Sequence, residues 1–206
     1  MNIFKIHRSP LFIRIVFVLA IFMMLLVSAL TYRHVESINI SSESLENTYK
    51  VSIEIEDLFS NIKNLEIERR NFLLTKNEKL PQLIFATKAQ ISLNIKQISK
   101  LTAENSDQKK HIKELQILLN EKFKIVEEAL INYDTFTSEK IKENLLEGRR
   151  VMDRISIVIE KMLSIEQDLL LKRDLTNSSL TSTTPKIIFI TLFTTIAIIS
   201  LAFVKI

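Results

Sequence analysis

The sequence lacks cysteine and tryptophan altogether, and its 206 residues include only one glycine and three prolines. Without cysteine, disulfides, thiolate metal sites and cysteine nucleophiles are excluded. A single glycine cannot supply a phosphate-binding glycine loop or a dinucleotide fingerprint, so the usual nucleotide-binding motifs are absent. Turn-rich β architectures also need regular glycines and prolines. Their scarcity therefore favours long, uninterrupted helices.

Basic charge is in excess only at the two ends of the chain. The protein carries 28 Lys plus Arg against 24 Asp plus Glu, a net charge of +4. Residues 1–32 and 186–206 together hold five of the basic residues and no acid, so 28 less 5 leaves 23 basic residues against all 24 acids between them. The central part is therefore close to neutral, and we expect no nucleic-acid binding.

Two apolar segments predict membrane helices. Residues 11–32 contain a single charge, Arg14, and at about 1.5 Å per residue they cover a hydrocarbon layer of roughly 30 Å. Residues 187–204 are uncharged and lie between Lys186 and Lys205, whose side chains can reach the headgroups. The second segment is about 27 Å long as a helix, which is enough to cross with little tilt.

The basic residues at the start of the chain predict a cytoplasmic N-terminal tail over residues 1–10, by the positive-inside rule. Residues 33–185 then form an extracytoplasmic domain, and residues 205–206 begin the cytoplasmic side, with no output domain after them. We therefore expect a protein of the bacterial inner (plasma) membrane. An alternative is a cleavable signal peptide, for which Val27-Ser-Ala29 would be a small-residue cleavage site.

In the domain between the spans, apolar residues recur at the 3/4 spacing of amphipathic helices in four successive stretches. The first stretch continues from the first span and ends near Thr75–Asn77. Thr75-Lys-Asn-Glu78 has the form of a capping box, and Pro81 fits an early helical position. The second helix is therefore expected to begin between 76 and 81 and to end near Glu104.

Capping residues also place the last two helices. Asn105-Ser-Asp107 offers an N-cap for the third helix, and Ser138 offers one for the fourth. The outer two helices are then about 45 residues, roughly 65 Å, and the middle pair is roughly 40 Å. We predict an all-α fold, an antiparallel up-down four-helix bundle with long first and fourth helices, flanked by two transmembrane helices. A lone helix pair buries its apolar stripe poorly, so we expect a homodimer to complete the stalk.

The densest charge constellation is Glu66-Ile-Glu-Arg69-Arg70. Glu66 and Arg70 stand four residues apart, and the apolar spacing brings Glu66 and Arg69 onto the core face. One interpretation is an ion pair that sets helix register or a dimer contact; another is a polar patch that binds a ligand or changes partners on signalling. The only glycine, Gly148, lies inside the fourth helix, where it costs roughly 1 kcal/mol relative to alanine and so predicts close packing.

No group of residues has the pattern of a catalytic, cofactor or metal site. The neighbouring carboxylates sit in helical charge patterns typical of solvated faces, without a paired base. The three histidines, His7, His34 and His111, are scattered, and we interpret His111 as a surface residue. We therefore expect a chain that is not itself an enzyme, with no cofactor.

Three stretches resemble the third class of CHASE domain, the extracellular sensory module of histidine kinases and cyclases. They are Arg70-Asn-Phe-Leu-Leu-Thr75 with Glu66 one turn earlier, Leu101-Thr-Ala-Glu-Asn105, and Gly148-Arg-Arg-Val-Met152. The resemblance covers about residues 45 to 175. Where the family usually has Gly-Gln-Arg-Gly-Tyr, this chain has Glu68-Arg-Arg-Asn-Phe72, so the small residues are missing.

The resemblance implies a dimeric four-helix sensor that relays a stimulus through the second span to a cytoplasmic output domain or partner kinase, with Glu66 and Arg70 as the positions carried over. We expect the N-terminal part of a sensor histidine kinase, with a ligand that the sequence does not identify. Two alternatives stay open: a chemotaxis-type receptor fragment whose bundle binds a small metabolite through convergent Arg and Asn, and a stand-alone membrane scaffold.

Overall fold

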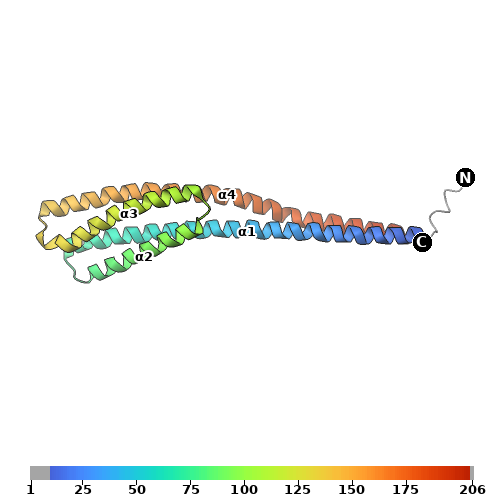
Figure 1. Ribbon diagram of the computed structural model, residues 1–206, viewed down its shortest axis with the longest axis horizontal. Helices are drawn as coiled ribbons and strands as arrows, with labels where there is room; N and C mark the ends of the chain where they lie inside the picture. The colour runs from blue at the N-terminus through green and yellow to red at the C-terminus, as the bar shows by residue number, and fades with distance from the viewer. Residues whose placement is uncertain (1–9, 205–206) are drawn as a thin grey trace. The chain divides into compact units, whose positions relative to one another are not determined.

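The computed structural model describes residues 10–204 and contains no strand among them. Its elements are α1 (Pro10–Thr75), α2 (Leu80–Leu101), α3 (Ser106–Asn132), the short 3-10 helix η2 (Tyr133–Thr135) and α4 (Ser138–Val204) (Figure 1). The prediction of an all-α chain with four helices is therefore confirmed. The predicted cytoplasmic segments fall almost wholly on residues 1–9 and 205–206, which lie outside the described residues.

The connection between α1 and α2 differs from the predicted capping box. Thr75 is the last residue of α1, and its hydroxyl donates to the Asn71 carbonyl (2.7 Å). Lys76 then takes a left-handed conformation with φ 55°, which stops the helix without a glycine. The N-cap of α2 is Lys79, which makes no side-chain cap bond, so the Thr75 cap was wrong. Pro81 does lie in the first turn of α2, as predicted.

The N-terminus of α3 agrees with the prediction, and that of α4 differs by one residue. Asn105 Oδ1 accepts hydrogen bonds from the backbone N–H groups of Asp107 and Gln108, both at 3.1 Å. At α4, Thr137 Oγ1 accepts from the Lys140 N–H (3.2 Å), and Ser138 is already the first helical residue. The predicted cap at Ser138 is therefore wrong by one position, because two adjacent hydroxyl residues are equivalent in a sequence pattern.

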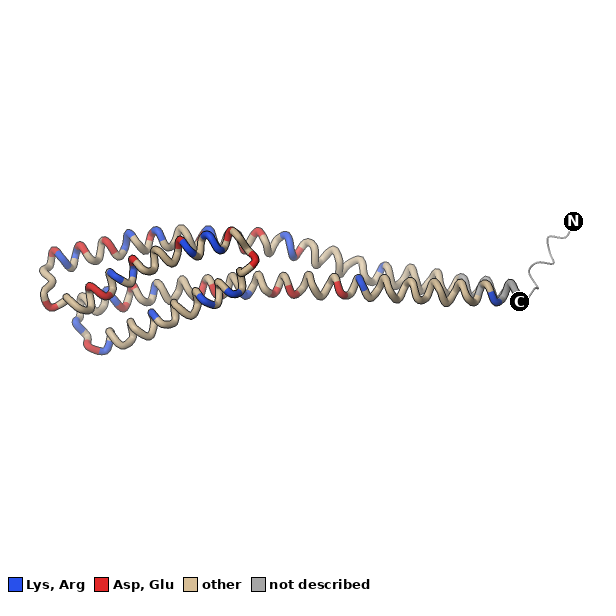
Figure 2. The backbone as a smooth tube through the Cα atoms, in the orientation of Figure 1, with Lys and Arg blue, Asp and Glu red and all other residues tan. Residues whose placement is uncertain are grey.

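The chain divides into two compact units. The four-helix unit is Glu46–Leu171, which contains α2, α3 and the adjoining parts of α1 and α4. The paired-helix unit comprises Met1–Leu45 and Lys172–Ile206, of which the structure describes 10–45 and 172–204. Charged residues are distributed along all four helices of the four-helix unit (Figure 2).

A single apolar core runs through the four-helix unit. Fully buried side chains of α1 recur at three- and four-residue steps, which is the spacing that keeps one helical face turned inward. Each fully buried Ile or Leu contributes roughly 1.5–3 kcal/mol, so this core dominates the stability of the unit. The core residues with essentially no exposure include Ile55, Leu58, Ile62 and Leu65 of α1, Ile84, Ile91 and Ile98 of α2, Leu115 of α3, and Ile155, Ile159 and Met162 of α4.

In the paired-helix unit, the apolar side chains face outward. Both α1 and α4 are long and apolar enough to cross a membrane by length and composition. Large apolar residues with more than half of their surface exposed include Phe17, Val18, Phe22, Met24 and Leu25 on α1, and Phe189, Ile190, Leu192 and Phe193 on α4. Such a surface is unfavourable in water and is what a helix in lipid presents.

Polar contacts join α1 to α4 within the paired-helix unit. They involve the part of α4 that precedes Pro185, a residue with no backbone N–H to donate, through which the helix nevertheless stays unbroken. The contacts are His34 Nε2 with the Leu180 carbonyl (3.1 Å), Ser42 Oγ donating to Asn177 Oδ1 (3.1 Å), and Arg173 Nη1 donating to the Ser44 carbonyl (2.6 Å).

Candidate functional site

The charged stretch of α1 contributes to the interior of the four-helix unit. Glu66 and Arg69 extend the buried stripe by one turn beyond Ile62 and Leu65, and they are 5% and 0% exposed. Arg70 lies one residue further around the helix, and its side chain is 45% exposed. The sequence prediction that Glu66 and Arg69 face the core is therefore confirmed. Spacing alone decides this, because a residue three or four positions after a buried one shares its face.

Both oxygens of the Glu66 carboxylate are fully engaged. Oε1 accepts from Arg69 Nη2 (2.8 Å) and from Arg70 Nε (2.5 Å). Oε2 accepts from Arg69 Nε (3.1 Å) and Nη2 (3.0 Å), and also from Nζ of Lys122. The planar guanidinium of Arg69 thus forms a bidentate hydrogen-bonded ion pair with the Glu66 carboxylate, the geometry that Arg favours.

Lys122 belongs to this site although the sequence pattern of α1 does not predict it. It lies on α3 with 0% exposure, and besides Glu66 it donates to the Gly148 carbonyl of α4 (3.0 Å). A signal was present, because Lys122 stands at a three- or four-residue step from Leu119 and Val126, inside an otherwise apolar stripe. A lysine in such a position predicts a buried partner of opposite charge.

Asn144 connects the same guanidinium to α4. Arg69 Nη1 donates to the Asn144 side-chain oxygen and, at 3.3 Å, to its backbone carbonyl. The Asn144 amide in turn donates to the Ile125 carbonyl of α3 (3.3 Å). The Glu66 cluster, defined as Glu66, Arg69, Arg70, Lys122 and Asn144, therefore ties α1, α3 and α4 together at one level of the unit.

Gly148 provides the space that the Glu66 cluster occupies. A Cβ atom added there would overlap Arg69 Nη2, lie 2.8 Å from Arg69 Cζ and 3.4 Å from Glu66 Oε2. A glycine in mid-helix was predicted to reflect close packing. The neighbour that requires it is the Arg69 guanidinium, rather than the backbone of a crossing helix.

The Glu66 cluster is electrostatically unbalanced. It places one carboxylate among three cations, two of which, Arg69 and Lys122, are fully buried. Burial alone would raise the pKa of the Glu66 carboxyl, but the hydrogen bonds and charges of Arg69 and Lys122 outweigh it and lower that pKa to about 2. Burial lowers the pKa of Lys122 to about 8, although the Glu66 charge opposes this shift. The Glu66 carboxyl is therefore ionised at neutral pH. Burial disfavours the charged form of the Lys122 ammonium.

A second buried polar contact joins α3 to α4. Gln108 Nε2 donates to the Met162 carbonyl (2.9 Å) and to Glu166 Oε1 (2.7 Å), and both side chains are buried. The Gln108 oxygen is buried without a hydrogen-bond partner among the described residues. This contact follows directly from the Asn105 cap, which starts α3 so that Gln108 enters the core in its first turn.

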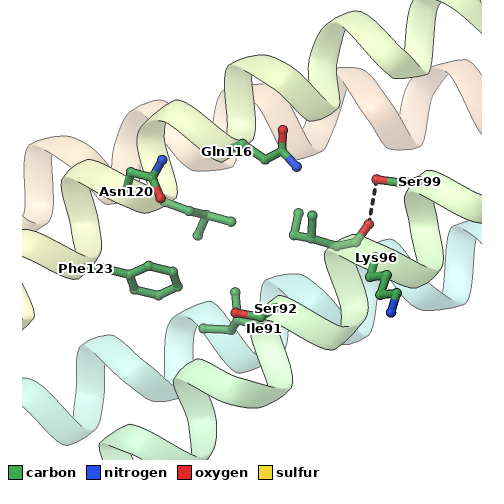
Figure 3. A pocket seen from close by; sticks show the side chains of 9 residues that line it. Ile91, Ser92, Lys96, Ser99, Gln116, Asn120 and Phe123 are labelled. Atoms are coloured by element: carbon green, nitrogen blue, oxygen red, sulfur yellow. Dashed lines mark hydrogen bonds between the residues drawn. The ribbon is translucent and has the colours of Figure 1, made fainter.

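A groove opens between α2 and α3 on the surface of the four-helix unit (Figure 3). Its volume is about 550 Å³, within the range of small-molecule sites. Its floor is apolar and its walls carry hydroxyl and amide groups. The lining residues are Ile91, Ser92, Ile95, Lys96 and Ser99 of α2, and Gln116, Leu119, Asn120 and Phe123 of α3.

The described part of the chain contains no candidate metal site. No group of three or more His, Asp or Glu side chains is placed to hold a metal ion there. His111 of α3, which we interpreted as a surface residue, is half-buried, and its Nδ1 lies 3.6 Å from Glu114 Oε2.

Residues 41–174 match the family model of the CHASE3 domain. No curated protein and no solved structure matches the chain. The matched residues take in the whole four-helix unit, including every member of the Glu66 cluster, Gly148 and the α2–α3 groove. The match covers well over half of the sequence, so this chain belongs to the CHASE3 family, the sensory domains of signalling receptors.

Proposed function

We propose that the chain is the extracytoplasmic sensory input module of a bacterial membrane receptor, the N-terminal part of a sensor histidine kinase. In this proposal the four-helix unit is an antiparallel up-down bundle outside the inner membrane, and residues 11–32 and 187–204 cross it. The observation that carries it is continuity: α1 and α4 each run as one helix from an exposed apolar stretch into the matched domain. A continuous helix transmits a shift or rotation along its axis without loss at a joint.

The Glu66 cluster supports a role in holding one of two helix packings. Its hydrogen bonds cross from α1 to α3 and α4, so an axial slide of α4 by one turn, about 5.4 Å, would part Arg69 from Asn144 and Lys122 from the Gly148 carbonyl. A stimulus that favours the alternative packing would therefore have to overcome these contacts. The relay then passes through α4 to the second span. No residue of this chain is assigned a catalytic role.

The absence of cysteine makes the topology directly testable. We would introduce single cysteines at Asn2 and Ser106 in the full chain and label intact cells with a membrane-impermeant maleimide. The proposal predicts labelling of Ser106→Cys and protection of Asn2→Cys until the membrane is opened. Labelling of Asn2→Cys from outside, or loss of residue 2 from the mature chain, would contradict the proposed topology.

Homodimerisation is part of the proposal, and single cysteines from Ser41 to Thr48 test it. Cross-linking between chains at every third or fourth position would support a dimeric stalk, because only one helical face meets the partner. A flat profile would leave a monomeric, membrane-anchored unit.

Two other functions have less support. A chemotaxis-type receptor that binds a metabolite through convergent Arg and Asn would use Arg69 and Asn144, but their meeting point is filled by Glu66 and Lys122. A membrane scaffold would not need a buried charge cluster such as the Glu66 cluster, which occupies the space left by Gly148. Fusion of residues 1–206 to the cytoplasmic portion of a histidine kinase separates these cases, since a scaffold predicts that output is independent of Glu66 and Arg70.

A further inference from the structure

The α2–α3 groove combines an apolar floor with two polar walls. Ile91, Ile95 and Leu119 form the floor, and all three are buried. Phe123, half-buried, presents its ring at one end (Figure 3). Concave sites of this composition, apolar with a few placed polar groups, are those that hold small molecules.

The α3 wall offers two uncommitted amides. Gln116 and Asn120 stand four residues apart, one helical turn, and Figure 3 shows both on the wall that faces α2. Both residues are exposed, and neither has a hydrogen-bond partner among the described residues. Each amide supplies donors and an acceptor, so together they match the polar edge of a ligand that both donates and accepts.

The α2 wall offers acceptors. Ser92 Oγ donates to the Lys88 carbonyl (3.1 Å) and Ser99 Oγ donates to the Ile95 carbonyl (2.8 Å). Because each hydroxyl proton is used within the helix, what remains toward the groove is the lone pairs of the oxygen. A ligand that hydrogen-bonds to this wall must therefore supply the N–H or O–H donors itself.

Charge is nearly absent from the groove. No carboxylate lines it, and the one cation of the lining, Lys96, points away from the α3 wall in Figure 3. Lys88 lies over the Phe123 ring at 4.8 Å from its centre, but its ammonium is paired with Glu127 at 2.5 Å. A cationic ligand would lose hydration and meet no lining carboxylate, and an anionic one would meet only Lys96, which points away from the α3 wall, so the groove favours an uncharged ligand.

We propose that the α2–α3 groove is the stimulus site of the module and that it binds an uncharged amphipathic small molecule. The apolar body of the ligand lies on Ile91 and Leu119 against Phe123, and an amide or hydroxyl edge bonds to Gln116 and Asn120. The assignment of this binding event as the stimulus rests on the proposed sensory function; the binding itself does not.

The position of the groove explains how occupancy would reach the Glu66 cluster. Phe123 directly follows Lys122 in α3, and Leu119 is three residues before it on the same face. A molecule wedged between α2 and α3 acts on this turn of α3, and Lys122 is the residue that connects the turn to Glu66 and to the Gly148 carbonyl. Binding would thus bias the contacts that fix the helix packing.

The lack of native tryptophan gives a clean reporter for the test. The full chain in lipid nanodiscs would carry Phe123→Trp in the groove or, as a matched control, Phe136→Trp in the loop before α4. The probes are 3-phenylpropanamide, which is neutral, and its anionic and cationic counterparts 3-phenylpropanoate and 3-phenylpropylammonium. We expect a saturable emission change with the amide at Phe123→Trp only. Gln116→Ala with Asn120→Ala should weaken it by about tenfold, and Gln97→Ala should not.

Thermal unfolding of the unmodified chain provides a second measurement that needs no tryptophan, since a ligand bound only to the folded state raises the midpoint. The amide should raise it and the Gln116→Ala, Asn120→Ala variant should lose that shift. No response to the amide in either measurement, equal responses at Phe123→Trp and Phe136→Trp, or a preference for a charged probe would overturn the proposal. Saturable binding that leaves kinase output unchanged in the fusion would keep the site and remove the sensory function instead.

Discussion

At the residue scale, the Glu66 cluster is held by one anion that serves two fully buried cations. Removal of a cation leaves the carboxylate with other partners, whereas removal of the carboxylate leaves Arg69 and Lys122 buried without any counter-charge. A buried ion pair contributes little compared with an apolar replacement, but breaking one is expensive. The cluster is therefore asymmetric, and single substitutions should reveal this.

We predict that Glu66→Ala destabilises the folded chain by about 3–5 kcal/mol in denaturant unfolding, because two buried cations lose their partner. Arg70→Ala should cost at most ~1 kcal/mol, since that side chain is 45% exposed and solvent screens its ion pair. The two substitutions together should be non-additive, with a coupling at the low end of the roughly 0.5–3 kcal/mol seen for contacting residues. Strict additivity would show that Glu66 and Arg70 do not interact.

The same carboxylate predicts a dependence of stability on acid. The folded pKa of Glu66 is about 2, below its ordinary value of 4.5, so its stabilisation is complete above about pH 4.5 and is lost as the pH falls toward 2. The loss should amount to roughly 3 kcal/mol in the free energy of unfolding. Glu66→Gln should remove this contribution. Between about pH 2 and 4.5 the free energy of unfolding should therefore fall less steeply with decreasing pH in the variant than in the wild type. Equal slopes in the two proteins would contradict the pKa shift.

Lys122 should add a second dependence of stability on pH, at alkaline pH. Its folded pKa of about 8 lies below the ordinary 10.5, so between these values the unfolded chain binds more protons than the folded chain. Stability should therefore rise with pH in this range, and Lys122→Met should abolish the rise. Unfolding of Lys122→Met at pH 7 and pH 10 provides the measurement, with Lys124→Met, at an exposed neighbour, as the control.

The effect of Gly148→Ala on stability should change sign with the residue at position 69. Gly148→Ala should destabilise the wild-type chain, because the added Cβ displaces the Arg69 guanidinium from hydrogen bonds worth about 1.5–3 kcal/mol, more than the roughly 1 kcal/mol gained in helix propensity. In an Arg69→Met background only the propensity gain is left, and the same substitution should stabilise. Equal effects in both backgrounds would show that the glycine serves another contact.

Much of this site was predictable from spacing, and the rest was not. Glu66 and Arg69 were placed on the core face because their positions follow the apolar stripe of their own helix. Lys122 and Asn144 come from other helices, and which residue of α3 or α4 meets Arg69 depends on the axial register between helices. That register is set by side-chain packing between helices, so no local sequence pattern reveals it.

At the scale of the elements, the two adjacent hydroxyl residues at the start of α4, Thr137 and Ser138, look equivalent as caps in the sequence but differ in the structure. Thr137 accepts the cap bond from Lys140, whereas Ser138 lies inside the helix. We predict that Thr137→Ala lowers the free energy of unfolding by about 1 kcal/mol. Ser138→Ala should change it by no more than a few tenths, since it exchanges one helical residue for a better helix former. The reverse order would show that the helix begins one residue later.

Helix ends were predicted well where a side chain makes the cap and poorly where the backbone does. Asn105 caps α3 as its sequence pattern predicts. The end of α1 depends instead on a left-handed lysine at position 76, a conformation that the sequence does not favour. The helix α2 ends at Leu101, earlier than predicted, where the backbone N–H and the hydroxyl of Thr102 both bond to the Ile98 carbonyl.

At the scale of the whole molecule, the helices that enter the four-helix unit are the same helices that carry the apolar stretches. The sequence predicted this continuity for α1 from an unbroken 3/4 pattern. In α4 a polar run, Thr176–Thr184, and Pro185 precede the second apolar segment, yet the helix runs through both. The hydroxyls of Thr176, Thr183 and Thr184 bond to carbonyls of the preceding turn, which satisfies them without interrupting the helix.

The contacts between α1 and α4 in the paired-helix unit lead to a final prediction, about whether these two helices pair within one chain. Ser42 Oγ and Asn177 Oδ1 are 3.1 Å apart, so cysteines at these two positions should be close enough for a disulfide or a short bis-thiol linker. The pair Ser42→Cys, Asn177→Cys should cross-link within a single chain in the membrane, while Glu43→Cys, Asn177→Cys should not, because Glu43 is about 100° further around α1. In the kinase fusion, the linked pair should fix output at one level, since a shift of α4 along α1 is then blocked. Cross-links that join two chains would show that the pairing is between protomers, and cross-links with normal signalling would exclude relative movement of α1 and α4 as the relay.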